Sequence, residues 1–157
     1  MEEYWKGKLP PCGRRVYAAA YAAFSRFEER VCFSGCSPEE AAQAYGALCN
    51  DHPELYHLAY DPRVKGGPFA QFCLCIDNIY DRGERRRIDE TLARIRRETV
   101  DKTARLSERE REIRVCDYLL SHTRYAVDNK RHQNAASVLV DGVGQCSGIA
   151  KAAKLLL

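Results

Sequence analysis

Cys146 is the residue whose type and position best fit covalent chemistry. It follows a glycine-bearing turn at residues 141–144 and begins a stretch with helical apolar spacing. A sulfur in the first turn of a helix lies among unpaired backbone N–H groups at the positive end of the helix dipole, which favours the nucleophilic thiolate. Gly144 and Gly148 would let a substrate backbone approach closely, and the backbone N–H of Cys146 is placed to help bind an oxyanion. A buried, inert cysteine at a helix start fits the same pattern equally well.

The other seven cysteines offer weaker signals for chemistry. They are Cys12, Cys32, Cys36, Cys49, Cys73, Cys75 and Cys116. A chain of 157 residues with amphipathic helices can build its own core, so we expect no disulfide scaffold. The short Cys-x3-Cys and Cys-x-Cys spacings are not those of zinc knuckles, and His122 and His132 are wrongly spaced to complete one. We therefore expect no metal or other cofactor, and most of the thiols to pack as small apolar side chains.

The overall composition excludes several classes of protein. Hydrophobic residues make up 45% of the chain, which is enough for the core of one domain. The 25 Lys and Arg residues nearly balance 22 Asp and Glu residues, and a net charge of +3 does not mark a nucleic-acid binder. No apolar run approaches the roughly 20 residues that cross a bilayer, and the N-terminal residues lack the pattern of a signal peptide. We expect a cytoplasmic protein that binds neither nucleic acid nor membrane.

The first half of the chain predicts two amphipathic helices and a β-hairpin. Residues 14–31 place apolar side chains at helical spacing, namely Val16, Ala20, Ala23, Phe24, Phe27 and Val31. Ser37 and Glu40 form a capping box that opens a second helix ending near residue 50. Its predicted inward side chains are Ala41, Tyr45, Leu48 and Cys49. Residues 55–60 and 69–76 predict two strands that pair as a hairpin.

The second half of the chain predicts further helices. From residue 82 to residue 114 the sequence is rich in Arg and Glu, with a narrow apolar seam at Ile88, Leu92, Ile95 and Thr99. Ser107 and Glu110 form another capping box, which opens a helix with Ile113, Cys116, Leu119 and Leu120 inward. Charges of both signs alternate, as on a solvated helix. A polar loop to residue 134 and a turn precede a last helix at 146–157, whose apolar face is Ile149, Ala153, Leu156 and Leu157. The predicted fold class is α+β, mostly helical, with a small β-hairpin.

Three segments together resemble the transglutaminase-like superfamily. Residues 138–156, VLVDGVGQCSGIAKAAKLL, are similar to the nucleophile region of that family, in which a glycine-containing turn precedes the catalytic cysteine and a helix ending in Leu pairs follows. Residues 115–120, followed by Tyr125, resemble the helix and loop before the nucleophile in bacterial members. Residues 51–56, DHPELY, resemble an Asp-x-Pro-Glu segment found in bacterial proteins that carry this domain. The likeness runs from about residue 40 onward and is strongest from residue 113.

The resemblance implies acyl transfer or amide hydrolysis on a protein or peptide substrate, within a papain-like fold. The Cys146 thiolate would attack an amide carbonyl and form a thioester, which an amine or water would then resolve. A histidine would act as base and then as acid, and an aspartate would orient it, without a metal or organic cofactor. On this interpretation residues 1–105 are an N-terminal helical region with the hairpin, and residues 106–157 begin the transglutaminase-like domain.

The sequence also departs from the family pattern. There, histidine and aspartate follow the nucleophile by tens of residues, whereas this sequence ends at Leu157, so only Cys146 can be matched. We expect an N-terminal fragment of a longer enzyme, inactive alone, whose uncovered last helix favours self-association or fraying. Caspase-like enzymes place histidine before cysteine, so His122 and His132 leave an upstream base open. The alternative is a non-catalytic helical interaction domain in which Cys146 only packs.

Overall fold

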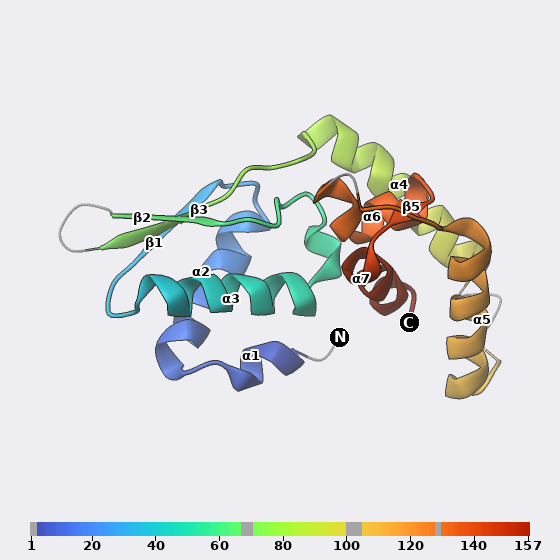
Figure 1. Ribbon diagram of the computed structural model, residues 1–157, viewed down its shortest axis with the longest axis horizontal. Helices are drawn as coiled ribbons and strands as arrows, with labels where there is room; N and C mark the ends of the chain where they lie inside the picture. Colours follow the sequence, from blue (N-terminus) through green and yellow to red (C-terminus); the bar gives the residue numbers. More distant parts are fainter. Residues whose placement is uncertain (1–2, 67–70, 100–104, 128–129) are drawn as a thin grey trace. The chain divides into compact units, whose positions relative to one another are not determined.

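The chain folds into two compact units, which comprise residues 1–79 and 80–157 and have separate hydrophobic cores. The computed structural model describes residues 3–66, 71–99, 105–127 and 130–157 (Figure 1). It is a mixed α/β structure and mostly helical, as the sequence predicts. The predicted boundary between residues 105 and 106 falls inside the second unit, and the start of a transglutaminase-like domain at that point stays a prediction. No helix in the described ranges is both long and apolar enough to cross a bilayer.

The first unit packs helices against a three-stranded sheet. Its elements are α1 (Tyr4–Lys8), α2 (Pro11–Phe24), β1 (Arg30–Phe33), α3 (Pro38–Asp51), the 3-10 helix η1 (Pro53–Leu55), β2 (Arg63–Gly66) and β3 (Phe72–Cys75). The strand order is β1-β3-β2, and both outer strands run antiparallel to β3. Helix α2 packs against α3, and both helices contact the sheet.

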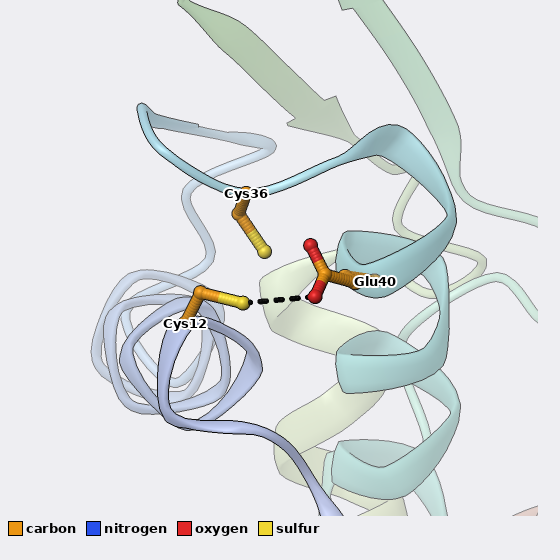
Figure 2. A group of neighbouring side chains, drawn as sticks. All are labelled: Cys12, Cys36 and Glu40. Atoms are coloured by element: carbon orange, nitrogen blue, oxygen red, sulfur yellow. Dashed lines mark hydrogen bonds between the residues drawn. The ribbon is translucent and has the colours of Figure 1, made fainter.

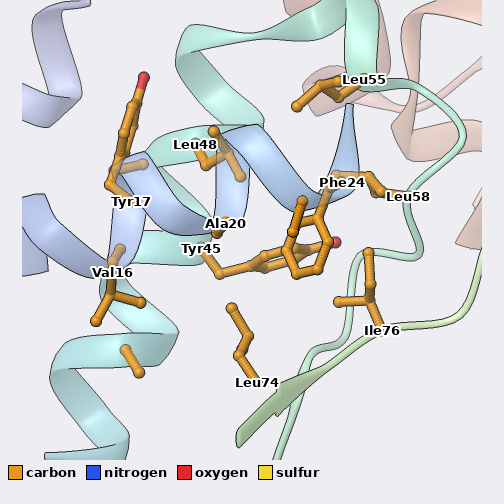
Figure 3. Packing of buried hydrophobic residues seen from close by; sticks show 14 of the residues in the cluster. Val16, Tyr17, Ala20, Phe24, Tyr45, Leu48, Leu55, Leu58, Leu74 and Ile76 are labelled. Carbon is orange, nitrogen blue, oxygen red and sulfur yellow. The ribbon is translucent and has the colours of Figure 1, made fainter. Parts of the chain in front are cut away.

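Apolar side chains from α2, α3 and β3 meet in one core (Figure 3). Phe24 and Tyr45 pack edge to face, with ring centroids 6.0 Å apart, and Leu74 from β3 is fully buried beside them. Burying a Leu or Phe side chain contributes about 1.5–3 kcal/mol, so this cluster is the main source of stability in the first unit. The structure buries these predicted inward residues: Val16, Ala20, Ala23, Phe24, Ala41, Tyr45 and Leu48.

The first predicted helix extends too far toward the C-terminus. Helix α2 ends at Phe24, and Phe27 has a φ of 65°, a left-handed conformation in which a right-handed helix cannot continue. Residues 30–33 then leave the helix path and pair with β3 as strand β1. Val31 still packs against the core, but it does so from a strand. Val31 therefore fits the helical spacing of the apolar residues before it only by coincidence, because it belongs to β1.

The predicted hairpin is confirmed in its second strand and wrong in its first. Strand β3 lies within the predicted segment 69–76, of which residues 69 and 70 lie outside the described residues. Residues 55–60 are not a strand: η1 ends at Leu55, a turn follows, and a single bridge joins Leu58 to Asn78. Four consecutive side chains from residue 55 to residue 58 are buried, which does not fit the alternating exposure of a strand on one face of a sheet. The hairpin partner of β3 is β2 instead.

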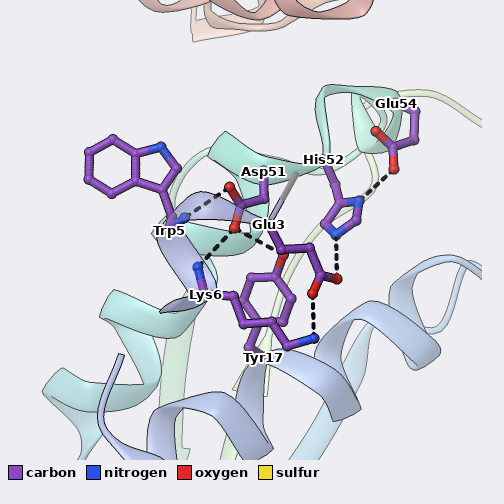
Figure 4. Close-up of polar contacts among 7 residues, drawn as sticks. All are labelled: Glu3, Trp5, Lys6, Tyr17, Asp51, His52 and Glu54. Atoms are coloured by element: carbon purple, nitrogen blue, oxygen red, sulfur yellow. Dashed lines mark hydrogen bonds and ion pairs between the residues drawn. The ribbon is translucent and has the colours of Figure 1, made fainter. Parts of the chain in front are cut away.

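Asp51, the last residue of α3, fastens α1 to the first unit (Figure 4). Its carboxylate is 1% exposed and accepts hydrogen bonds from the backbone N–H groups of Trp5 (3.1 Å) and Lys6 (2.9 Å). It also accepts one from the Tyr17 hydroxyl at 3.2 Å. Burial and this carboxylate raise the pKa of Tyr17, so the hydroxyl keeps its proton and remains a donor. Asp51, the first residue of the DHPE segment, thus has a structural role.

The second unit consists of helices and one two-stranded parallel pair. Its elements are α4 (Arg82–Thr99), α5 (Glu108–His122), β4 (Arg124–Tyr125), the 3-10 helix η3 (Lys130–Gln133), α6 (Ala135–Val140), β5 (Val143–Gly144) and α7 (Cys146–Leu156). The predicted capping box of α5 is present, with Ser107 and Glu110 each accepting from the other's backbone N–H. The predicted polar loop at residues 122–134, of which residues 128 and 129 lie outside the described ranges, also contains β4 and η3. The core is formed by Ile95, Val115, Leu119, Ala135, Val138, Leu139, Ala152 and Leu156.

The inward face of α5 differs from the prediction. Val115 and Leu119, four residues apart, are buried. Leu120 is 82% exposed, and Ile113 and Cys116 are also exposed. The helix therefore buries one narrow stripe, because only that stripe meets apolar side chains of the second unit.

The apolar face of α7 is covered, which corrects the expectation that it lacks a partner. Leu156 is 2% exposed, and Ile149 and Ala153 pack against the core of the second unit. Helices α5 and α6 provide the covering surface. Leu157 remains exposed. The predicted self-association assumed an uncovered last helix, and the structure removes that basis.

One disulfide bond joins two strands of the first unit. Cys32 on β1 and Cys73 on β3 are partners in the strand register and are bonded to one another. The other six cysteines are free, so the bond is a single cross-link and not a scaffold. Nothing in the local sequence predicts this bond, whose two cysteines are 41 positions apart. Disulfides are typical of oxidising compartments, so this bond does not support the expected cytoplasmic location.

Candidate functional site

Cys146 is the first residue of α7, as predicted, and its side chain is exposed. Gln145 takes the N-cap position with extended backbone dihedrals, and α7 has no side-chain cap in the described part of the chain. The N–H groups of its first turn are therefore available as donors beside the thiol. The position that the sequence predicts for Cys146 is confirmed, and its catalytic role stays a prediction.

Hydrogen bonds fix the segment that leads into Cys146. Strand β5 pairs in parallel with β4 directly before the helix begins. The N–H of Gln145 donates to the carbonyl oxygen of His132 at 2.8 Å. The Ser137 hydroxyl donates to the carbonyl oxygen of Val143 at 2.9 Å. The thiol is thus presented by a turn that is held by η3, α6 and β4 together.

Three glycines allow the chain to take this path. Gly142 has a φ of 66°, which side-chain-bearing residues rarely adopt. A Cβ on Gly144 would overlap the side chain of Val138, and a Cβ on Gly148 would overlap the carbonyl oxygen of His132. Close packing against the Val138 side chain and the His132 carbonyl oxygen, and not only substrate access, therefore accounts for Gly144 and Gly148.

The two upstream histidines have different surroundings. The His122 ring stacks on Tyr118 with ring centroids 4.2 Å apart, and its Nδ1 lies 2.8 Å from the carbonyl oxygen of the same tyrosine. His132 lies in η3, where its carbonyl oxygen supports the turn before Cys146. Partial burial raises the pKa of Asp141, and the charges of His132 and Arg131 oppose this rise. His122, the last residue of α5, stacks on its own helix, and a role for either histidine as a base stays a prediction.

A hollow in the second unit lies away from Cys146. It has a volume of about 500 Å³ and lies between α4 and α5. Its lining residues are Glu98, Thr99, Leu106, Arg114, Asp117, Tyr118 and Ser121. Cys146 does not contribute to it, so the thiol lies on an exposed surface and outside this hollow.

A second cluster of reactive side chains lies in the first unit (Figure 2). The Sγ atoms of Cys12 and Cys36 and a carboxylate oxygen of Glu40 all lie within 4.8 Å of one another. The Cys12 thiol donates a hydrogen bond to Glu40 Oε1 at 3.1 Å. Glu40 Oε2 accepts a hydrogen bond from the backbone N–H of Ser37 at 2.8 Å, as part of the capping box of α3.

Burial and neighbouring polar groups shift the pKa values of the side chains in this cluster. Cys36 is 8% exposed. Burial, together with the neighbouring Cys12 and Glu40 side chains, raises the pKa of the Cys36 thiol to about 12. The hydrogen bonds that Glu40 accepts from Ser37 and Cys12 lower the pKa of its carboxyl group. The cluster therefore pairs a neutral, buried thiol with an anionic carboxylate that points at both sulfurs.

This cluster cannot be predicted from cysteines that are close in the sequence. Cys32 and Cys36 do not act together, since Cys32 bonds to Cys73 on the sheet. Cys36 instead faces Cys12 on the neighbouring helix, and Cys12 and Glu40 are 28 positions apart. The capping box did predict that Glu40 lies in the first turn of a helix that starts shortly after Cys36. The short sequence separation of Cys36 and Glu40 was therefore the local signal for this cluster.

Comparison of the chain with models of known protein families finds no match, and comparison with curated proteins likewise finds none. Function must therefore be argued from the residues and their geometry.

Proposed function

We propose that Cys146 is the nucleophile of a transglutaminase-like cysteine enzyme that acts on an amide of a protein or peptide. In this proposal the chain contributes the N-terminal part of the enzyme, and histidine and aspartate partners from outside these 157 residues complete the site. The 157 residues alone would then have little or no activity, because a nucleophile without an acid and base cannot move the protons.

The observation that carries the proposal is the exposed position of Cys146 at the start of α7. The turn before it is held by hydrogen bonds from three elements, and glycine is needed at Gly144 and Gly148 for the chain to fit. A backbone held in this way places the side chain of Cys146 beside the N–H groups of the first helical turn. Such a fixed arrangement of nucleophile and donors is what acyl transfer requires.

The chemistry follows from this placement. The sulfur attacks the amide carbonyl carbon, and N–H donors at the start of α7 stabilise the negative oxygen that forms. The carbon–nitrogen bond then breaks, and the leaving amine takes the proton that the base removed from the thiol. A second amine or a water molecule attacks the thioester, releases the product and restores the thiol.

Alkylation tests whether Cys146 is activated, with Cys116 as a matched control. Both cysteines are exposed and free, but Cys116 lies in the middle of α5 and lacks unpaired N–H donors beside it. We expect iodoacetamide to modify Cys146 faster than Cys116 at neutral pH, because the start of a helix stabilises a negatively charged sulfur. Mass spectrometry of digested protein over a time course measures both rates. Equal rates, or a slower Cys146, would contradict an activated thiol.

A substitution separates this function from the alternative of a non-catalytic helical interaction domain. The variant is Cys146→Ser in a protein that contains this chain together with the proposed histidine and aspartate. Loss of amidase and transamidase activity, with the Cys116→Ser control still active, supports the nucleophile. Full activity in the Cys146→Ser variant removes Cys146 from the mechanism and favours a packing role.

A further inference from the structure

We propose that Cys12, Cys36 and Glu40 form a binding site for one Zn²⁺ ion in the first unit. This inference concerns a different unit from Cys146 and does not rest on the proposed acyl transfer. It rests on the convergence of two thiols and a carboxylate from α2, α3 and the loop before α3 (Figure 2).

The chemistry of the three side chains suits zinc. Zn²⁺ accepts cysteine sulfur and glutamate oxygen in a tetrahedral arrangement. Bond lengths near 2.3 Å to sulfur and 2.1 Å to oxygen place neighbouring ligand atoms about 3.5–3.8 Å apart. In the structure the three ligand atoms lie within 4.8 Å of one another, and Cys12 Sγ lies 3.1 Å from Glu40 Oε1. Small side-chain rotations, without a change in the backbone, therefore bring them to ligand distances.

The backbone holds each ligand in place before any ion arrives. Cys12 lies in the first turn of α2, directly after the proline that begins the helix. Gly35, with a φ of 67°, turns the chain from β1 so that Cys36 faces α2. Glu40 is oriented because its second oxygen accepts the Ser37 N–H. Outer hydrogen bonds of this kind are typical of metal-binding carboxylates.

A divalent cation would balance the negative charge that the cluster acquires when its two thiols lose their protons. Two thiolates and a carboxylate within 4.8 Å of one another would repel each other strongly without a counterion. On binding, two Zn–S bonds replace two S–H bonds, and both protons pass to the buffer. The described residues supply three ligands, which leaves the fourth tetrahedral position to water or to an added donor.

The competing chemistry for two close thiols is oxidation to a Cys12–Cys36 disulfide. In the structure both cysteines are free, while Cys32 and Cys73 are bonded. The carboxylate of Glu40 between the sulfurs plays no part in a disulfide, but it is a ligand for an ion. A substitution at Glu40 therefore distinguishes the two chemistries.

The experiment uses the full 157-residue chain, kept free of oxygen, with a thiol assay to establish that Cys32 and Cys73 remain bonded. Co²⁺ is added first as a spectroscopic probe, and Zn²⁺ is then titrated against it. We expect one Co²⁺ per chain, a tetrahedral visible spectrum and a sulfur-to-cobalt charge-transfer band. Zn²⁺ should displace the cobalt at one equivalent, because zinc prefers this geometry and ligand set.

Three variants and two controls locate the ion. Cys12→Ser and Cys36→Ser should each remove about half of the charge-transfer intensity and weaken zinc binding by at least about tenfold, since each loses one thiolate. Glu40→Gln keeps the capping box, in which glutamine serves as well as glutamate, but removes the anionic ligand. It should weaken binding while leaving the charge-transfer intensity unchanged. Cys75→Ser and Cys116→Ser, which also lose one thiol each, should bind like the unchanged chain.

Several outcomes would overturn the site. They are no tetrahedral cobalt spectrum in the unchanged chain, binding unaffected by Glu40→Gln, or binding lost equally in the Cys75→Ser control. A Cys12–Cys36 disulfide that forms readily in air, in a reduced chain that binds no zinc, would also overturn it. Because the cobalt spectrum of the unchanged chain is itself decisive, a variant that fails to fold does not remove the test.

Discussion

At the scale of single residues, glycine determines how Cys146 is presented. Gly144 and Gly148 flank the start of α7, where a Cβ on either would meet atoms of α6 or η3. From the sequence, these small residues are expected to give access to a substrate backbone. The structure adds a packing reason, because Gly144 lies against the Val138 side chain and Gly148 lies against the His132 carbonyl oxygen, which leaves no room for a Cβ.

We predict that Gly148→Ala destabilises the second unit by about 1–3 kcal/mol, because an added Cβ overlaps the carbonyl oxygen of His132 and forces backbone to shift. The matched control is Gly46→Ala, a helical glycine of α3 with nothing within 4 Å of its Cβ position. Alanine at that site should stabilise the protein by about 0.5–1 kcal/mol. Urea unfolding followed by circular dichroism measures both changes. Equal stability of the Gly148→Ala variant and the unchanged chain would show that the backbone has more room than the structure indicates.

At the scale of helices and strands, features set by neighbouring residues could be predicted from the sequence, whereas features set by contacts between distant residues could not. The capping boxes at Ser37 and Ser107 are correct to the residue, because the four residues that form each box are neighbours in the sequence. Strand β1 was missed because its partner β3 lies about forty positions away in register, and short strands are defined by such partners. The start of α7 at Cys146 was also predicted correctly, from a glycine turn followed by helical spacing.

The partners of the cysteines are a second case in which contacts between distant residues could not be predicted from the sequence. Cys32 and Cys36 are close in the sequence, yet they belong to different partnerships. Packing of α2 beside α3 brings Cys12 to Cys36, and the strand register brings Cys32 to Cys73. Neither arrangement follows from spacing alone, because both depend on which elements become neighbours in the folded chain.

We predict that the β1–β3 disulfide forms and stabilises the first unit. Under non-reducing, denaturing conditions, iodoacetamide should modify six cysteines and leave Cys32 and Cys73 unmodified. Loss of the bond in a Cys32→Ser and Cys73→Ser double variant should lower the free energy of unfolding by about 4 kcal/mol. The reason is that the bond closes a loop between residues 41 positions apart and so lowers the conformational entropy of the unfolded chain. Thiol counting by mass spectrometry and urea unfolding provide the measurements. Modification of all eight cysteines would show that the bond does not form.

At the scale of the whole molecule, each unit has its own core and its own candidate site. The zinc ligands Cys12, Cys36 and Glu40 all come from the first unit. Cys146 and every residue that holds its turn come from the second unit. The two proposals therefore share no residue and can fail or succeed separately.

We predict that zinc binding leaves the reactivity of Cys146 unchanged. Sites with no shared partners act independently within about twofold, so the rate of Cys146 alkylation should stay within that range when one equivalent of Zn²⁺ is added. Alkylation of Cys12 should slow strongly in the same sample, since a metal-bound sulfur is protected. The Cys36→Ser variant provides the control, because it should lose protection of Cys12 and retain the Cys146 rate. A change of about tenfold or more in the Cys146 alkylation rate on adding zinc would show that the ion acts on the second unit and that the two sites are coupled.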